Sequence, residues 1–231
     1  MTQYWSLCIN LQGPMQAWGV ESKLTFKSTS LAPSKSGVIG IIASSLGIER
    51  NNIDYLSKLS QLKFATVCLE KKPKFILKDY HTISDVSQCN GKIKDTELTD
   101  RFYLIDWHFL AIIEGDNQLL EKIKYALQYP KWHVFLGRKC CPPASPFIYK
   151  NALKECSIED LLSINGDYLC YKETNITNKI LNSKSEFDDV ISYEDRTFSK
   201  KTYFEDRIDL IKLQDTIFPL KEQKNAILHE N

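Results

Sequence analysis

The chain has 231 residues, of which 43% are hydrophobic and 26% are charged, and its 30 Lys and Arg against 29 Asp and Glu leave a formal charge of +1. This composition belongs to a globular protein with a sizeable core, and it excludes collagen-like, low-complexity and wholly disordered classes. No run reaches the ~18 to 20 apolar residues of a membrane span and the N-terminus lacks a secretory signal pattern, so we expect a cytoplasmic protein with no membrane partner.

Hydrophobic patterning predicts an alternation of strands and helices along the chain. Residues 4–11 alternate as a strand, the stretch through Ser34 reads as a long ordered loop, and residues 37–46 form a helix with Ser34 as its cap and Gly47 at its end. The elements predicted after it are a short helix at 52–62, a strand at 64–69, a hairpin around residues 89–92, a core strand at 103–114, a helix at 119–129 and a strand at 132–136.

This order of elements predicts an α+β fold. Across residues 1–137 it matches the β-α-β-β-α-β order of a ferredoxin-like fold with insertions, the architecture that also underlies the RNA-recognition motif. The remainder of the chain is different, because residues 151–231 are acidic and hold strand candidates at 167–171 and 206–213. We therefore expect a small β-rich appendage after the ferredoxin-like part.

The small net charge hides a segregation of charge along the chain. Residues 1–150 hold 19 Lys and Arg and 13 Asp and Glu, a net charge of +6, whereas residues 151–231 hold 11 and 16, a net charge of −5. Such asymmetry permits a basic working surface on the first two thirds of the chain, although the solvated faces of a neutral protein produce it about as often.

The cysteines and histidines predict neither disulfides nor a metal site. The seven cysteines include no Cys-x-x-Cys, and a disulfide between the neighbours Cys140 and Cys141 would be strained. The four histidines form no paired spacing with the cysteines. We expect reduced thiols, no metal and no cofactor.

Signatures of a serine nucleophile and of a phosphate-binding loop are missing from the sequence. Asp79, His81 and Asp85 could form a metal or general-base cluster, and Tyr80 with His81 an acid–base pair for RNA cleavage. Neighbours in a strand point to opposite faces, so Tyr80 and His81 would point apart. A structural role for this pair is the favoured interpretation.

Residues 13–19 form the first of three segments suited to binding. Met15 and Trp18 offer polarizable and flat surfaces, and the flanking glycines permit close approach of a backbone, which suits stacking of a splayed RNA base. The same residues would equally suit a loop that plugs its own core.

The other two segments carry cations. Lys35, Ser36 and Gly37 stand in the first turn of a predicted helix, where free N–H groups form an anion-binding end. Arg138 and Lys139 are adjacent cations placed where the chain leaves a predicted strand, a geometry that suits backbone phosphates. The alternative for this last pair is a solvated turn.

These segments together are more specific than any one of them. The chain reads Gly-Pro-Met-Gln-Ala-Trp-Gly at 13–19, Lys-Ser-Gly-Val-Ile-Gly at 35–40 with Leu-Gly-Ile at 46–48, Asp-Tyr-His-Thr at 79–82 and Leu-Gly-Arg-Lys-Cys-Cys-Pro-Pro at 136–143. In the order and spacing of these motifs, residues 4–147 resemble the CasD subunits of the type I-E CRISPR Cascade complex, within the RAMP superfamily.

The resemblance implies a ferredoxin-like palm over residues 1–147, an inserted thumb β-hairpin within 79–106, and a separate small acidic β-rich C-terminal part over 148–231. It implies a non-catalytic subunit that binds and caps the 5′ handle of the mature crRNA. Its partners would be the backbone subunit, the large subunit and, as a further candidate, the small subunit of the complex. Target DNA would be met only through that complex.

The resemblance also implies site residues, carried over motif by motif. The handle pocket would be lined by Met15, Gln16, Ala17 and Trp18, with Lys35, Ser36 and Gly37 near its phosphates, with Tyr80, His81 and Thr82 at the start of the thumb, and with Arg138 and Lys139 facing the RNA backbone. Many members of the family read Arg-Arg-Ser-Cys at 138–141, so Lys139 keeps the charge of its counterpart but lacks the guanidinium fork.

Two alternatives to this function stay open. One is a metal-independent endoribonuclease that processes precursor crRNA, with Tyr80, His81 and Lys78 as acid, base and charge stabiliser. The other is a scaffold that binds protein alone.

Overall fold

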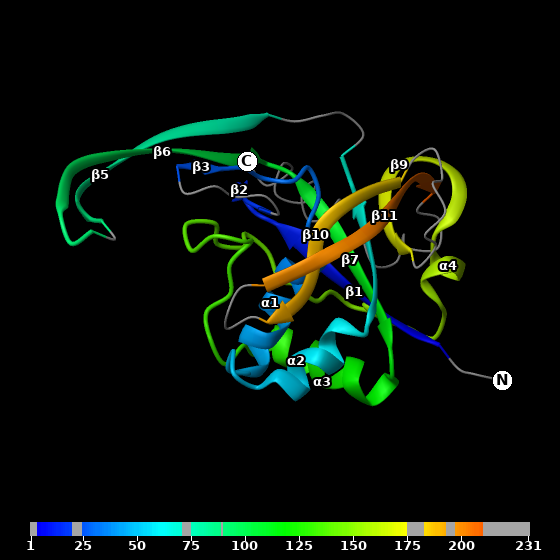
Figure 1. Cartoon of the computed structure of the whole chain (residues 1–231). Helices are drawn as coiled ribbons and strands as arrows, with labels where there is room; N and C mark the ends of the chain where they lie inside the picture. Colours follow the sequence, from blue (N-terminus) through cyan, green and yellow to red (C-terminus); the bar gives the residue numbers. More distant parts are fainter. Residues whose placement is uncertain are drawn as a thin grey trace, which may run out of the picture.

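The computed structural model describes residues 4–19, 25–70, 75–88, 90–174, 183–192 and 197–209. A seven-stranded antiparallel sheet forms the centre of the molecule, and a long hairpin projects from it (Figure 1). Three helices cover one face of this sheet, and a short fourth helix lies on the other.

Four strands of the large sheet have the ferredoxin-like arrangement. They lie side by side in the order β4-β7-β1-β8, each antiparallel to its neighbour. Their bounds are β1 (Trp5–Gln12), β4 (Lys63–Cys68), β7 (His108–Gly115) and β8 (Leu153–Lys154). Helices α1 (Lys35–Leu46) and α2 (Ile53–Ser60) connect β1 to β4, and α3 (Asn117–Gln128) follows β7. The predicted α+β ferredoxin-like fold is confirmed.

The strand predicted at residues 132–136 is wrong. The fourth palm strand is β8, and the amides of Lys131 and Trp132 donate instead to the carbonyls of Ser45 and Ser44 at the end of α1. A backbone amide that donates to a carbonyl at a helix end cannot also pair with the edge strand of a sheet. This segment therefore folds over α1.

Local sequence explains where α1 begins and ends. The hydroxyl of Ser34 accepts a hydrogen bond from the amide of Gly37, and Gly47 ends the helix with a φ of 71°, a left-handed conformation that glycine adopts without strain. Both ends agree with the sequence prediction.

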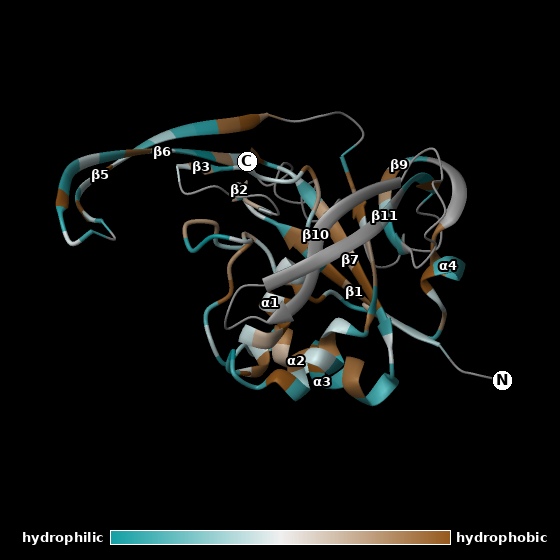
Figure 2. Ribbon diagram, viewed as in Figure 1, coloured by the Kyte–Doolittle hydropathy of each residue, from teal (hydrophilic) through white to brown (hydrophobic). Residues whose placement is uncertain are grey.

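Strand alternation divides the core between the two faces of the sheet. On one face, Leu7, Ile9 and Leu11 of β1 pack with α1, α2 and α3 in the larger hydrophobic cluster. On the other face, Cys8 packs with buried residues of β4 and β7 and of α4 (Ile158–Leu161). Figure 2 shows the corresponding hydrophobic colouring along β1 and β7.

The thumb hairpin is confirmed. It consists of β5 (Ile76–Ser87) and β6 (Ile93–Ile105), and two short strands, β2 (Met15–Gln16) and β3 (Phe26–Lys27), pair with the basal half of β6. The strand predicted as continuous over 103–114 is two strands, since Asp106 adopts a φ of 57° between β6 and β7. The chain therefore turns from the thumb into the palm at this residue.

The C-terminal part is β-rich, as predicted. Its strands are β9 (Ser163–Thr174), β10 (Ser183–Ser192) and β11 (Thr197–Asp209), and they extend the large sheet in the order β10-β11-β9-β4. The candidate strand at 167–171 lies within β9, and the one at 206–213 overlaps the end of β11, with residues 210–213 outside the described residues. The division of the chain at residue 147 stays a prediction, because β8 and β9 pair directly with the palm strands β1 and β4.

Candidate nucleic-acid interface

Three motifs that lie far apart in the sequence meet at the start of α1. Trp18 is 1% exposed, and its ring lies so close to Gly37 that a Cβ on that glycine would stand 2.9 Å from Cε3 of the indole. From the other side, a Cβ on Gly137 would overlap the carbonyl oxygen of Ala17, whose amide donates to Leu136 at 3.0 Å. The loop of residues 13–19 is therefore clamped between α1 and the segment 136–143.

This clamp corrects the role expected of Gln16, Ala17 and Trp18, because all three side chains are buried. The indole Nε1 of Trp18 donates to Oε1 of Gln16 at 3.0 Å, and Nε2 of Gln16 donates to the carbonyl of Trp107 at 2.7 Å. No face of the Trp18 ring is open to an RNA base. The ring packs inside the protein, whereas the sequence suggested that it stacks on a base. Met15 is half-buried at the edge of the loop.

The cationic first turn of α1 is also used inside the fold. Lys35 is 3% exposed, and its Nζ lies 2.8 Å from Oε2 of Glu173 on β9. The amide of Gly37 is occupied by the capping hydroxyl of Ser34. Ser36 is half-buried, and its hydroxyl lies 3.3 Å from that of Ser34, so its expected place beside a phosphate stays a prediction. The ion pair therefore corrects the expectation of a phosphate contact from Lys35.

Arg138 holds the base of the thumb. Its guanidinium donates to the carbonyls of Phe102 on β6 at 3.2 Å, Lys27 on β3 at 2.9 Å and Ser28 at 3.3 Å, and it lies 4.8 Å from the ring centroid of Tyr103. Because these donors are committed to three carbonyls, they are not available to the RNA backbone that Arg138 was expected to face. Lys139, the next residue, is exposed, so its ammonium group is the cation of this pair that is open to a ligand.

The thiol of Cys141, which follows this pair, is protonated at neutral pH. Burial, with the nearby thiol of Cys140, raises the pKa of Cys141 to about 12. Burial is also the main cause of the raised pKa of Tyr103, whose hydroxyl lies 3.5 Å from Sγ of Cys140. Neither group carries a charge at neutral pH, so the cationic character of residues 136–143 comes from Arg138 and Lys139.

Tyr80, His81 and Thr82 lie on β5 and are accessible in the thumb. Tyr80 is 63% exposed, and Nδ1 of His81 lies 3.9 Å from Oδ2 of Asp79. Lys78 pairs with a carboxylate of β6 at 2.9 Å. Lys78 and Tyr80 share one face of the strand whereas His81 faces the other, so the proposed acid, base and charge stabiliser of a nuclease do not converge.

Sequence reasoning missed a groove of about 600 Å³ between α1 and the segment 132–139. Two cations, Arg50 and Lys139, and one carboxylate, Glu49, line it together with Trp132 and His133. The indole of Trp132 is 42% exposed. A Cβ on Gly40 would meet nothing within 4 Å, so the helix leaves this space open. The sequence does hint at this groove, because a cation stands next to aromatic residues at 131–133. The prediction of a strand over the same residues hid that hint.

The described ranges contain no group of three or more His, Cys, Asp or Glu side chains able to hold a metal ion. Across the same part of the chain, none of the helices has the length and apolar character needed to cross a bilayer.

Comparison with known proteins places the chain in a family. The family model described as CRISPR-associated protein (Cas_Cas5) matches residues 6–206. The CRISPR system Cascade subunit CasD of Escherichia coli (strain K12) is 27% identical over 212 residues, which cover 85% of this chain and 94% of that protein.

Solved structures agree with this match. One described as "Crystal structure of Cas protein" is 25% identical, with a TM-score of 0.68 over 90% of this chain and 96% of its own. A chain of a "CRISPR RNA-guided surveillance complex" is 23% identical and shares the fold, with a TM-score of 0.63 over 88% of this chain and 91% of its own. The chain therefore belongs to the CRISPR-associated Cas5 protein family.

Proposed function

We propose that this protein is a non-catalytic RNA-binding subunit of a type I-E CRISPR surveillance complex in the cytoplasm. It binds and caps the 5′ handle of the mature crRNA, contacts the backbone and large subunits, and meets target DNA only through the complex. Membership of the Cas5 family supports this proposal, as does the similarity to a protein named as a Cascade subunit.

The observation that carries the proposal is the groove beside α1, lined by Gly37, Gly40, Arg50, Trp132 and Lys139. Single-stranded RNA is held by cations along its backbone and by aromatic rings that stack on its bases. Arg50 and Lys139 supply the first element, and the part-exposed Trp132 supplies the second. The small residues of α1 leave room for a backbone to approach the helix closely.

Residues of the neighbouring elements complete the proposed interface. Met15 and Ser36 are half-buried near the start of α1, and Tyr80, His81 and Thr82 present side chains from the thumb. The buried residues Gln16, Ala17, Trp18 and Lys35 and the half-buried Arg138 support this surface from within.

The first test fills the groove without touching the core. Gly40 faces open space, so Gly40→Met should lower the affinity for handle RNA at least tenfold without lowering the melting temperature. Lys139→Met should weaken binding and reduce the salt slope by about one, because one phosphate contact is lost. Lys58→Met, which removes an exposed cation of α2 outside the groove, is the matched control.

Retention of wild-type affinity by both groove variants would refute the groove as the RNA site. Sequencing of RNA that co-purifies with the complex tests handle recognition separately: uniform 5′ ends from one repeat are expected, and random cellular RNA would contradict it. Repeat RNA incubated with the protein in a chelator should stay intact, and a defined cut would establish the nuclease in place of this proposal.

A further inference from the structure

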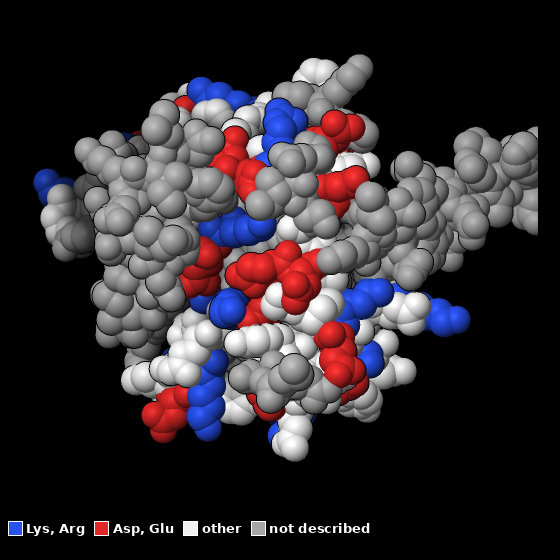
Figure 3. All heavy atoms as spheres, turned by 90° about the vertical axis from the view of Figure 1, so that its right-hand side faces the viewer, with Lys and Arg blue, Asp and Glu red and all other residues white. Residues whose placement is uncertain are grey.

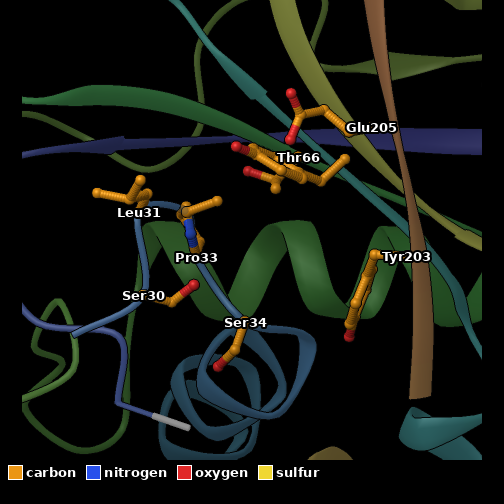
Figure 4. A pocket seen from close by; sticks show the side chains of 9 residues that line it. Ser30, Leu31, Pro33, Ser34, Thr66, Tyr203 and Glu205 are labelled. Carbon is orange, nitrogen blue, oxygen red and sulfur yellow. The ribbon is translucent and has the colours of Figure 1, made fainter. Parts of the chain in front are cut away.

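A second cavity, of about 240 Å³, lies where the loop before α1 meets the large sheet. Figure 4 shows side chains from three parts of the chain around it: the loop of residues 30–34, strand β4 and strand β11. Tyr171 of β9 also lines it, together with Thr66 of β4 and with Tyr203 and Glu205 of β11. The cavity is thus walled by hydroxyl groups, two tyrosine rings and one carboxylate, and by the apolar side chains of Leu31, Ala32 and Pro33.

Thr66 indicates that this cavity takes a polar ligand. The residue is 1% exposed, and its Oγ1 has no hydrogen-bond partner among the described residues. A buried hydroxyl without a partner destabilises the folded state, and such groups are rare unless a ligand or water satisfies them. The wall of the cavity therefore has an unused donor and acceptor.

The charges around the cavity favour a cation. Glu205 is exposed, and no Lys or Arg is among the described residues that line the cavity. Two cations of neighbouring elements face carboxylates: Lys35 of α1 pairs with Glu173 at 2.8 Å, and Lys172 of β9 lies 4.0 Å from Asp206. Figure 3 shows the side of the molecule that carries β9 and α4, where acidic and basic side chains are interspersed. Residues 151–231 carry a net charge of −5.

We infer that this cavity receives one arginine side chain of a partner protein. A guanidinium group is planar, carries five N–H donors and stacks on aromatic rings. The carboxylate of Glu205 and Oγ1 of Thr66 accept its hydrogen bonds, and the rings of Tyr171 and Tyr203 provide cation–π contact. A nucleotide fits less well, because its phosphate would lie near Glu205 with no cation of the cavity to neutralise it.

The test titrates the RNA-free full chain with Nα-acetyl-arginine amide and, separately, with the citrulline counterpart, which has nearly the same shape and no charge. NMR shifts of the Thr66 methyl group and of the tyrosine rings report binding. We expect at least tenfold weaker binding of the citrulline compound. Glu205→Gln should weaken arginine binding at least fivefold, whereas Glu159→Gln, an exposed carboxylate of α4 outside the cavity, should leave it unchanged.

Thr66→Val is a nearly isosteric second variant. Because the lost hydroxyl has no hydrogen-bond partner among the described residues, its removal should raise the melting temperature and still weaken arginine binding. A lower melting temperature, equal binding of the citrulline compound, or wild-type affinity in Glu205→Gln would each overturn the inference. Binding of cytidine or adenosine 5′-monophosphate in place of the arginine compound would identify a nucleotide pocket. None of these outcomes bears on RNA binding in the groove, which the Gly40 variant tests separately.

Discussion

The indole ring of Trp18 lies on the backbone of Gly37, at a distance that leaves no room for a side chain on the glycine. The two residues belong to different sequence motifs, and each motif alone suggested a contact with RNA. Their packing against one another shows a different relationship. The loop of residues 13–19 is anchored inside the fold by residues 35–40 at the start of α1. This anchoring places the start of α1 beside the groove.

Gly37→Ala should lower the free energy of unfolding by about 1–3 kcal/mol, because the new Cβ forces the Trp18 ring out of its packed position. Gly40→Ala, three residues along the same helix, meets nothing within 4 Å and should raise the free energy of unfolding by up to about 1 kcal/mol through helix propensity. Urea unfolding of both variants measures the difference. Equal stabilities would show that the contact with Trp18 is not tight.

Arg138→Lys should lower the free energy of unfolding by about 2 kcal/mol, because a lysine cannot reproduce the forked hydrogen bonds to Phe102, Lys27 and Ser28. Hydrogen exchange should speed up in β3 and in the basal half of β6. Lys139→Met is the control and should change stability by less than about 0.5 kcal/mol, since Lys139 is exposed. An equal loss in both variants would contradict the structural role of Arg138.

Lys35→Met should destabilise the fold by about 3–5 kcal/mol, because it leaves the carboxylate of Glu173 buried without its partner. The double variant Lys35→Met with Glu173→Leu should recover most of that loss, since no uncompensated charge remains. Chemical unfolding of the two single variants and the double variant measures the coupling. Strictly additive losses would show that the pair does not interact.

Stability should fall as the pH rises from 9.0 to about 12. Burial raises the pKa of Cys8 and of Cys170 from 9.0 to about 12 in the folded protein. Above pH 9.0 the unfolded chain loses thiol protons that the folded chain keeps, so the free energy of unfolding decreases, by up to about 1.4 kcal/mol per pH unit for each thiol.

Unfolding in urea at pH 8, 9 and 10 measures this dependence. In the double variant Cys8→Ala with Cys170→Ala, the free energy of unfolding should fall less steeply with pH than in the wild type. At pH 8 the variant should already be less stable than the wild type. Cys140→Ala removes an exposed thiol that contributes to the raised pKa of Cys141, so its slope should change less than that of the double variant. Identical slopes in all three proteins would show that the buried thiols do not cause the loss.

The sequence alone determined the features that depend on local chemistry. The order of strands and helices follows from hydrophobic periodicity, and the limits of α1 follow from a capping serine and a terminal glycine. The turn of the thumb follows from the pair Asn90 and Gly91, and Gly91 adopts a φ of 76° that few other residues adopt easily. The family followed from four motifs in order, which no single motif would have indicated.

Tertiary structure decided which residues of those motifs face a ligand. Lys35 is paired with a residue 138 positions away, and Arg138 binds a carbonyl 111 positions away, so neither partner can be read from the local sequence. Residues 132–136 and 153–154 compete for the same sheet edge, and the hydrogen bonds to the end of α1 exclude the first of them. The groove likewise joins residues of α1 to residues 132–139. Whether a side chain is buried and whether its charge is neutralised depend on which distant segments of the chain meet. The local sequence pattern does not determine those meetings.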